Sequence, residues 1–197
     1  EYAKRAYDAG STLAHFHARE DDGSPSWRPE VFESILNEVR KRCPILVNFS
    51  TGGIGQTIEE RTEYLTRIRP DMAALNMGSM NYAVYSSKAK KFYFDDVFLN
   101  PFKDIITALT RMKAAGVIPE MECFDAGHIA NTEPLIDLGL LTPPFHFSFI
   151  LGVTGGMGAT PKHLKFMSEI IPANSSWQVI GISRDQWRLC QEALKLG

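Results

Sequence analysis

The stretch TLAHFHA, residues 12–18, predicts the first strand of the fold, because a β-branched threonine opens a short run of apolar and aromatic residues. Its two histidines, His15 and His17, alternate with other residues, so their side chains share one face of a strand. Apolar residues then recur at helical spacing over residues 31–39, behind Pro29, and proline is favoured in the first turn of a helix. Together these segments predict a strand followed by a helix.

The same alternation continues along the chain. The strands expected from apolar and β-branched runs are residues 12–18, 45–50, 72–77, 118–124, 145–153 and 177–182. Apolar spacing predicts helices over residues 31–39 and over residues 102–112 behind Pro101. Capping signals start two more helices, at Thr57 with Glu60 and at Thr160 with Pro161. The chain begins with a helix over residues 1–9 closed by Gly10, and it ends with a helix over residues 183–196, begun by a Ser183–Gln186 capping pattern and closed by Gly197.

Strands that alternate with helices predict an α/β fold with a parallel sheet. Six strands with a helix at each end predict a (β/α)8 TIM barrel that lacks its first and last strands, since a whole barrel has eight strands and about 250 residues. We expect residues 1–197 to form a single barrel domain, incomplete at both ends, with a natural gene product that extends beyond both. The alternative is an open doubly wound sheet, which usually has a glycine-rich first turn for nucleotide phosphates.

The composition favours a small-molecule partner. The chain has 197 residues, 44% of them hydrophobic and 22% charged, with a net charge of −2 and no basic block, which argues against nucleic acid and membrane surfaces as partners. No apolar run is long enough for a membrane span and no signal peptide is evident, so a cytoplasmic location is expected. The three cysteines are widely spaced and are expected to be reduced thiols.

Polar residues gather where the expected strands end, which is where barrel enzymes place their active sites. His15 and His17 can supply two of the three protein ligands of a catalytic zinc. The alternative is that they only form hydrogen bonds inside the barrel mouth. Glu120 and Glu122 share a strand face, and burying two carboxylates requires a cation or hydrogen-bond partners, so a functional role competes with a structural salt bridge.

Two turns are suited to anions. Ser50-Thr51-Gly52-Gly53 offers hydroxyls and unhindered backbone N–H groups, which suit a carboxylate. Gly155-Gly156-Met157-Gly158 leads into a helix N-terminus, and Arg184 offers bidentate pairing, so we expect both to hold phosphates of coenzyme A. A plain flexible loop is the alternative for the glycine-rich segment.

Taken together, these motifs resemble those of the beta-keto acid cleavage enzyme family. The segments that carry the resemblance, in family order, are AGSTLAHFHAREDDGSPS, NFSTGG, DMAALNMGSMN, PEMECFDAGHI, FILGVTGGMGATP and WQVIGISRDQ. The resemblance implies a homotetrameric (β/α)8 barrel that uses a divalent metal, usually zinc. It also implies a retro-Claisen acyl transfer, in which a β-keto acid and acetyl-CoA give acetoacetate and a new acyl-CoA.

The resemblance also implies roles for individual residues. His15 and His17 are the metal ligands of the H-x-H motif, while Ser50 and Gly53 bind the substrate carboxylate together with Ser79. The catalytic groups within the sequence are Ser50 and Glu122, the latter preferred to Glu120 because it lies nearer the expected catalytic mouth. A third metal ligand, an arginine and a catalytic aspartate are expected in a segment beyond Gly197.

Two other functions remain open at the level of sequence. A metal-dependent hydrolase of the amidohydrolase type also has H-x-H at a strand end, but it needs histidines at later strand ends, and His146 falls at the start of its strand. A barrel remnant that keeps the metal pair without catalysis is the non-enzymatic alternative.

Overall fold

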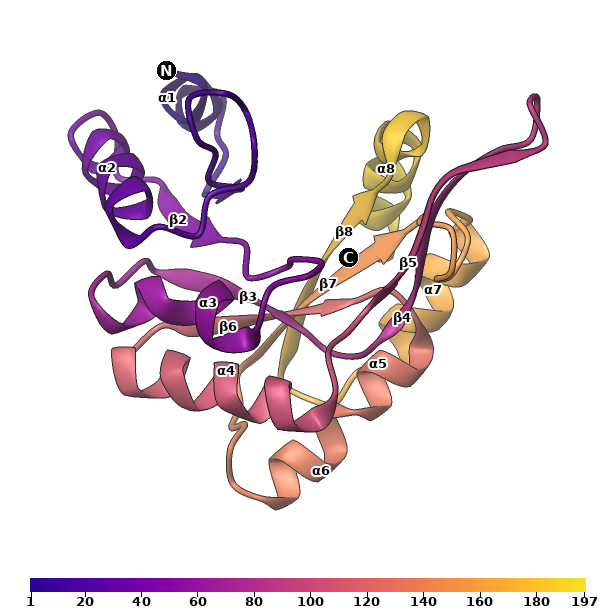
Figure 1. Cartoon of the computed structure of the whole chain (residues 1–197). Coiled ribbons are helices and arrows are strands. Elements are labelled where there is room, and N and C mark those ends of the chain that lie inside the picture. Colours follow the sequence, from indigo (N-terminus) through magenta and orange to yellow (C-terminus); the bar gives the residue numbers. More distant parts are fainter. The chain divides into compact units, whose positions relative to one another are not determined.

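The computed structural model describes residues Glu1–Gly197 and divides into two compact units. The first comprises residues 1–75 and 107–119, and the second comprises residues 76–106 and 120–197, so the helix α4 (Phe102–Ala115) is shared between them. Both units contain parallel strands with helices between them (Figure 1).

The first unit contains three parallel strands that pair in sequence order. Its elements are α1 (Tyr2–Asp8), β1 (Leu13–Phe16), α2 (Pro29–Arg40), β2 (Leu46–Phe49), α3 (Ile58–Thr62), the 3-10 helix η1 (Glu63–Thr66) and β3 (Met72–Asn76). β1 pairs with β2 from Leu13 opposite Leu46 to Phe16 opposite Phe49, and β2 pairs with β3. The ends of β1 and β2 therefore lie next to each other.

An aromatic cluster holds α2 against β2. Phe32 of α2 is stacked on Tyr64 at 4.1 Å between ring centroids, and its edge meets Phe49 of β2 at 5.0 Å. All three rings are buried, together with Leu36 and Val39 on the same face of the helix. This is the apolar face that the spacing behind Pro29 predicts.

The second unit contains a second run of parallel strands and a separate hairpin. Its elements are β4 (Met80–Ser86), β5 (Lys91–Phe98), β6 (Ile118–Cys123), α5 (Ala126–Ala130), α6 (Thr132–Asp137), β7 (Phe145–Leu151), α7 (Pro161–Glu169), β8 (Ser175–Gly181), the 3-10 helix η2 (Ser183–Asp185) and α8 (Gln186–Leu196). β6 pairs with β7 and β7 with β8, all parallel. Phe149 and Trp177 stack across β7 and β8 at 5.4 Å.

The six-stranded sheet has the order β1-β2-β3-β6-β7-β8, which follows the sequence without reversal. A doubly wound sheet reverses its strand order at a switch point, whereas a barrel does not. The expected α/β class and the barrel-like order are confirmed, with six of the eight strands of a closed (β/α)8 barrel. The single-domain description of residues 1–197 stays a prediction.

All six expected strands are present, with ends that differ by a few residues. The capping box of Thr57 and Glu60 and the N-cap Thr160 are confirmed. The capping pattern expected at Ser183 is wrong, because Ser183 has a positive φ of 58° in η2, and α8 begins only at Gln186. The β4–β5 hairpin was not expected from the sequence.

Candidate functional site

His15 and His17 meet at the carboxyl end of β1. His15 is half-buried and His17 is exposed, and their Nε2 atoms are 3.3 Å apart. Two imidazole nitrogens bound to one tetrahedral zinc at about 2.0–2.1 Å would also lie about 3.3 Å apart. Desolvation and the positive charges of His15 and Arg19 lower the pKa of His17, which favours the neutral imidazole. The pair therefore fits a divalent cation.

The turn after β2 is tightly held. Ser50 and Thr51 are buried, the Ser50 N–H donates to the Phe16 carbonyl at 3.0 Å, and the Thr51 hydroxyl donates to the Ala74 carbonyl at 2.6 Å. The Gly52 N–H donates to Ser50 Oγ at 3.1 Å. Because Ser50 Oγ accepts in this bond, its own proton remains available as a donor to a ligand.

Gly53 has no space for a side chain. A Cβ atom at this position would lie 2.7 Å from the ring of Trp27 and 3.0 Å from Cδ of the buried Arg61. The Arg61 guanidinium donates to the Thr51 carbonyl at 3.4 Å. Trp27 and Arg61 thus pack against the backbone of the turn, which holds its N–H groups in fixed positions.

Glu120 of β6 is the best-anchored acidic residue of the second unit. Its side chain is fully buried, and Oε1 accepts from the Ser148 hydroxyl of β7 and from the Gln178 amide of β8, both at 2.5 Å. The Gln178 amide also donates to Ser148 Oγ at 2.8 Å. Three neighbouring strands thus supply a polar network in which the carboxylate has the hydrogen bonds that its burial requires.

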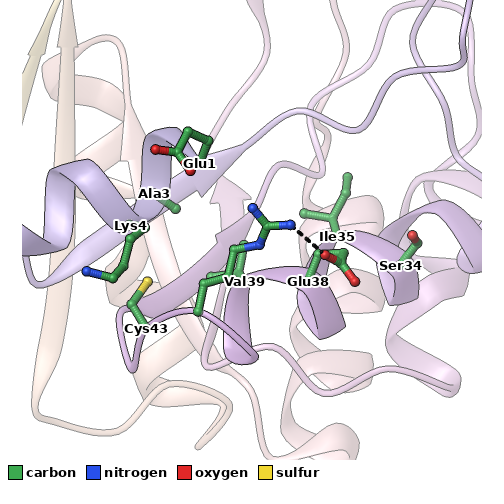
Figure 2. Close-up of a pocket in the computed structure, with 9 residues that line it drawn as sticks. Glu1, Ala3, Lys4, Ser34, Ile35, Glu38, Val39 and Cys43 are labelled. Carbon is green, nitrogen blue, oxygen red and sulfur yellow. Dashed lines mark hydrogen bonds and ion pairs between the residues drawn. The ribbon is translucent and has the colours of Figure 1, made fainter.

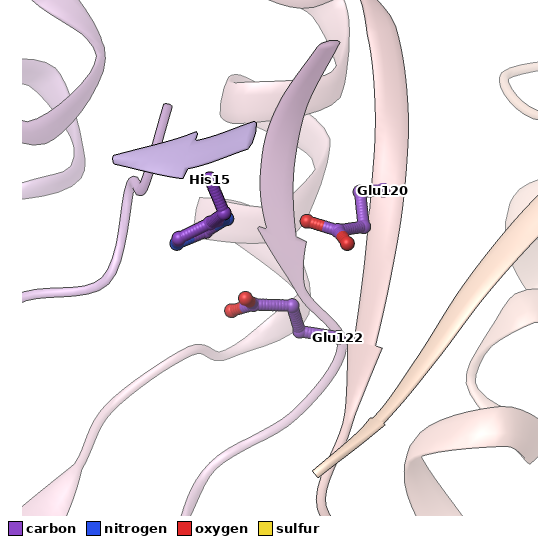
Figure 3. A group of neighbouring side chains, drawn as sticks. All are labelled: His15, Glu120 and Glu122. Atoms are coloured by element: carbon purple, nitrogen blue, oxygen red, sulfur yellow. The ribbon is translucent and has the colours of Figure 1, made fainter. Parts of the chain in front are cut away.

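Glu122 lies two residues further along β6 and is 6% exposed. Because side chains alternate along a strand, Glu122 shares the face of Glu120. The side chains of Glu120, Glu122 and His15 are drawn in Figure 3. His15 belongs to the first unit and the glutamates to the second.

Ser79 and the buried His128 lie at one junction of the second unit. A Cβ on Gly78 would lie 2.5 Å from the His128 ring, so the glycine allows that ring to pack on the backbone. His128 Nδ1 accepts from the Phe124 N–H at 3.3 Å, and burial lowers its pKa. Ser79 is exposed, and its Oγ accepts from the Asn100 N–H at 2.7 Å. His128 is therefore a structural neighbour of Ser79.

The glycine-rich loop after β7 makes close backbone contacts. Gly155 has a φ of +109°, and a Cβ there would lie 1.8 Å from the Asn81 carbonyl oxygen. The Gly156 N–H donates to Val153 and the Met157 N–H to Phe124. The contact with Asn81 explains why residue 155 is a glycine. The Gly156 and Met157 N–H groups are already bonded, so fewer donors remain for a coenzyme phosphate than the sequence indicates. Arg184, in η2, is exposed and makes no ion pair.

A model of the beta-keto acid cleavage enzyme family matches residues 1–197. The chain belongs to this family. It is 36% identical over 197 residues to the 3-keto-5-aminohexanoate cleavage enzyme of Acetoanaerobium sticklandii, covering 99% of this chain and 68% of the relative. It is 34% identical over 203 residues to the 3,5-dioxohexanoate:acetyl-CoA acetone transferase of Paraburkholderia graminis, covering 93% of this chain and 66% of the relative.

Among solved structures, the apo structure of ObcA matches with a TM-score of 0.74 and 18% identity, covering 99% of this chain and 51% of ObcA. At this identity the likeness concerns the fold. This member of the beta-keto acid cleavage enzyme family therefore spans about two thirds of the length of the curated relatives and about half of the solved structure. No helix in it combines the length and the apolar character needed to cross a membrane.

A pocket of about 300 Å³ lies elsewhere in this family member, at α1 and α2 (Figure 2). Lys4, Glu38, Arg42 and Cys43 are among its lining residues, and Arg42 is paired with Glu38 at 3.0 Å. None of the predicted site residues lines it. The pocket is formed by helices and not by strand ends, so it is unrelated to the chemistry described above.

Two polar residues that hold Glu120, Ser148 and Gln178, were missed in the sequence. Asn76, at the end of β3, is 4% exposed, and both of its amide atoms lack a hydrogen-bond partner. Ser148 interrupts the run Phe145–Leu151 at a position that pairs with Glu122. Polar residues on the inward face of an apolar strand were the signal that could have identified it.

Proposed function

We propose that this protein cleaves a β-keto acid with acetyl-CoA, giving acetoacetate and the acyl-CoA of the remaining fragment. The acetyl group leaves its thioester and joins the two carboxyl-terminal carbons of the β-keto acid, while coenzyme A takes the acyl group that those carbons leave. The observation that carries the proposal is the 3.3 Å separation of the His15 and His17 Nε2 atoms at the end of β1, in a chain of this family.

The proposal assigns a divalent cation, with zinc as the first candidate, to His15 and His17. A zinc ion at this place would polarise a substrate carbonyl and stabilise negative charge on its oxygen. The lowered pKa of His17 supports the assignment, because a metal ligand must be a neutral imidazole.

The substrate carboxylate is assigned to Ser50, Gly53 and Ser79. The Ser50 hydroxyl proton has no acceptor within the chain, and the packing of Gly53 against Trp27 leaves its N–H in a fixed turn. These are donors with little freedom to reorganise, so they bind an anion at a low entropic cost. They orient the β-keto acid for acyl transfer.

Glu122 is proposed as the acidic residue that contacts the substrate. The preference over Glu120 is supported by the network at Glu120, whose Oε1 already accepts from Ser148 and Gln178. Glu120 then acts as a fixed neighbour on the same strand face. Ser50 is proposed as the second catalytic group, through the proton that it can donate to an oxygen that gains negative charge.

Coenzyme A phosphates are assigned to Arg184, Gly155 and Gly156. The unpaired guanidinium of Arg184 supports this assignment more strongly than the glycines do, because the Gly156 N–H is already bonded to Val153. The proposed enzyme is a cytoplasmic homotetramer built on a single barrel domain. These last three properties follow from the family resemblance and the composition.

An isotope-tracing assay tests the reaction. The purified protein is incubated with acetyl-CoA labelled with ¹³C in its acetyl group and with a panel of β-keto acids, and the products are identified by mass spectrometry. We expect label in acetoacetate and none in the new acyl-CoA, for at least one substrate. A free carboxylic acid in place of the acyl-CoA would indicate a hydrolase, and no conversion of any substrate would refute the proposal.

A further inference from the structure

The turn that follows β3 is held by side chains that bond to its backbone carbonyls. The Asn131 amide donates to the Met77 carbonyl at 2.7 Å, and the Asn100 amide donates to the Gly78 carbonyl at 3.4 Å. Asn131 is the C-cap of α5 and Asn100 follows β5, so two segments far apart in the sequence meet at this turn. Because buried carbonyls require hydrogen-bond partners, these contacts restrict the conformations open to the turn.

His128 of α5 makes a third contact with the same turn. The side chain is 6% exposed and packs on Gly78, where a Cβ would lie 2.5 Å from Cδ2 and 2.7 Å from Nε2 of the ring. The Phe124 N–H donates to Nδ1 at 3.3 Å, so the neutral imidazole carries its proton on Nε2. The ring also forms a hydrogen bond with the Ser79 backbone. Since Nδ1 accepts, Nε2–H is the donor and the Ser79 carbonyl the acceptor.

Ser79 is thus held at both its backbone and its side chain. His128 binds its carbonyl, and the Asn100 N–H donates to its Oγ at 2.7 Å. Because Oγ accepts in that bond, the hydroxyl proton is left for a ligand. Ser79 is exposed, whereas His128 is buried, so a ligand can reach the serine while the histidine supports it from the interior.

We propose that His128 is a positioning residue for Ser79 and thereby sets the affinity for the β-keto acid. The inference rests on the proposed function, in which Ser79 binds the substrate carboxylate. The bond from Nε2–H fixes the Ser79 peptide group before the substrate arrives, so less conformational entropy is lost on binding. His128 acts only through Ser79, and its loss should leave the affinity for acetyl-CoA unchanged.

Two substitutions separate the roles of the two ring nitrogens. In His128→Gln the side-chain amide extends to the place of Nε2 and can still donate to the Ser79 carbonyl, whereas in His128→Asn it extends only to the place of Nδ1. Both variants lose the ring that packs on Gly78, so both should lose a similar free energy of unfolding. We expect the KM for the β-keto acid to rise about tenfold in His128→Asn, the equivalent of roughly one hydrogen bond, and at most about twofold in His128→Gln.

Thr132→Ala is the control for a loss of stability alone. The Thr132 hydroxyl is buried and donates to the Ile129 carbonyl, not to the turn after β3. This variant should be less stable than the parent, with both KM values unchanged. Equal KM values for the β-keto acid in His128→Asn and His128→Gln, or a rise that Thr132→Ala reproduces, would overturn the proposal.

Amide hydrogen exchange, followed by NMR, tests the same contact without substrate. The Met77 N–H donates to the Glu122 carbonyl at 3.1 Å, and its exchange rate depends on how firmly the turn is held. Exchange at Met77 should be faster in His128→Asn than in the parent, and close to the parent rate in His128→Gln. A parent that converts no β-keto acid would refute the proposed function, whereas an unchanged exchange rate in His128→Asn would overturn the role of His128.

Discussion

The His15–His17 pair and the Glu120 network are two polar clusters with different relations to solvent. The histidines lie at the end of β1, half-buried and exposed, and their nitrogens face each other. Glu120 is fully buried, and the chain itself supplies donors to its carboxylate from Ser148 and Gln178. The first cluster is suited to an external cation, whereas the second is complete within the protein. A polar residue at a strand end is thus a better candidate for binding a cation when the chain does not already supply hydrogen bonds to it.

Removal of the histidine pair should have the largest effect on function. His15→Ala combined with His17→Ala deletes both proposed imidazole ligands, and we expect metal affinity to fall more than about 100-fold, beyond the effect of losing an outer-shell partner. Acyl transfer should fall with it. Titration of the metal-free protein with Zn²⁺ by calorimetry measures the affinity, and His163→Gln is the matched histidine control. Unchanged zinc affinity in the double variant would remove the distinction between the two clusters.

Loss of a hydrogen bond to Glu120 should lower the free energy of unfolding. Ser148→Ala removes a donor to a buried carboxylate, and an unsatisfied buried polar group costs about 1–3 kcal/mol, more when it is charged. The free energy of unfolding, from urea denaturation, should fall by at least this amount. The control is Ser176→Ala, on the neighbouring strand, where the hydroxyl contacts only His146 and a backbone carbonyl. Equal losses for the two serines would show that Glu120 gains nothing from Ser148.

Gly53→Ala should separate binding from folding at the turn after β2. The added methyl lies within 3.0 Å of the Trp27 ring and of Arg61, so the turn must shift. Overpacking of this kind costs about 1–3 kcal/mol. We expect the KM for the β-keto acid to rise by more than that for acetyl-CoA. The control is Gly127→Ala in α5, where an added Cβ would meet only Asp125 Oδ1 at 3.5 Å, an ordinary contact distance. Equal changes in both KM values would argue against a carboxylate site at Gly53.

Arg184→Ala should have the smallest effect. An exposed ion pair contributes about 0.2–1 kcal/mol, so the KM for acetyl-CoA should rise a few-fold, while the KM for the β-keto acid stays constant. Steady-state kinetics with each substrate varied in turn measures both. Arg188→Ala is the control, because that guanidinium is already paired with Asp185 at 3.0 Å. A KM for acetyl-CoA that matches the parent would remove Arg184 from the proposed coenzyme site.

The regular part of the fold was predictable because its signals are local. The apolar runs specified six strands, and Pro29 and Thr160 marked helix starts that the structure confirms. The β4–β5 hairpin was missed because its turn, residues 87–90, contains no glycine, asparagine or proline, and Lys90 adopts the positive φ of 48°.

The candidate site was predictable only in part. His15 and His17 are two residues apart, so their proximity follows from strand geometry alone. The contact of Glu120 with Ser148 and Gln178 depends on the register between β6, β7 and β8, which no local pattern encodes. The same holds for Gly155, whose contact with Asn81 joins residues far apart in the sequence.

That contact has a thermodynamic consequence. Gly155 packs on the Asn81 carbonyl of β4, and the Ala83 N–H, two residues further along β4, donates to the Thr154 carbonyl. The loop after β7 and the base of the hairpin are therefore held together. A ligand that displaces this loop must also displace β4. Ligand binding at the loop and docking of the hairpin are therefore linked equilibria. If docking of the hairpin changes the affinity of the loop for a ligand, the bound ligand changes the docking equilibrium by the same factor.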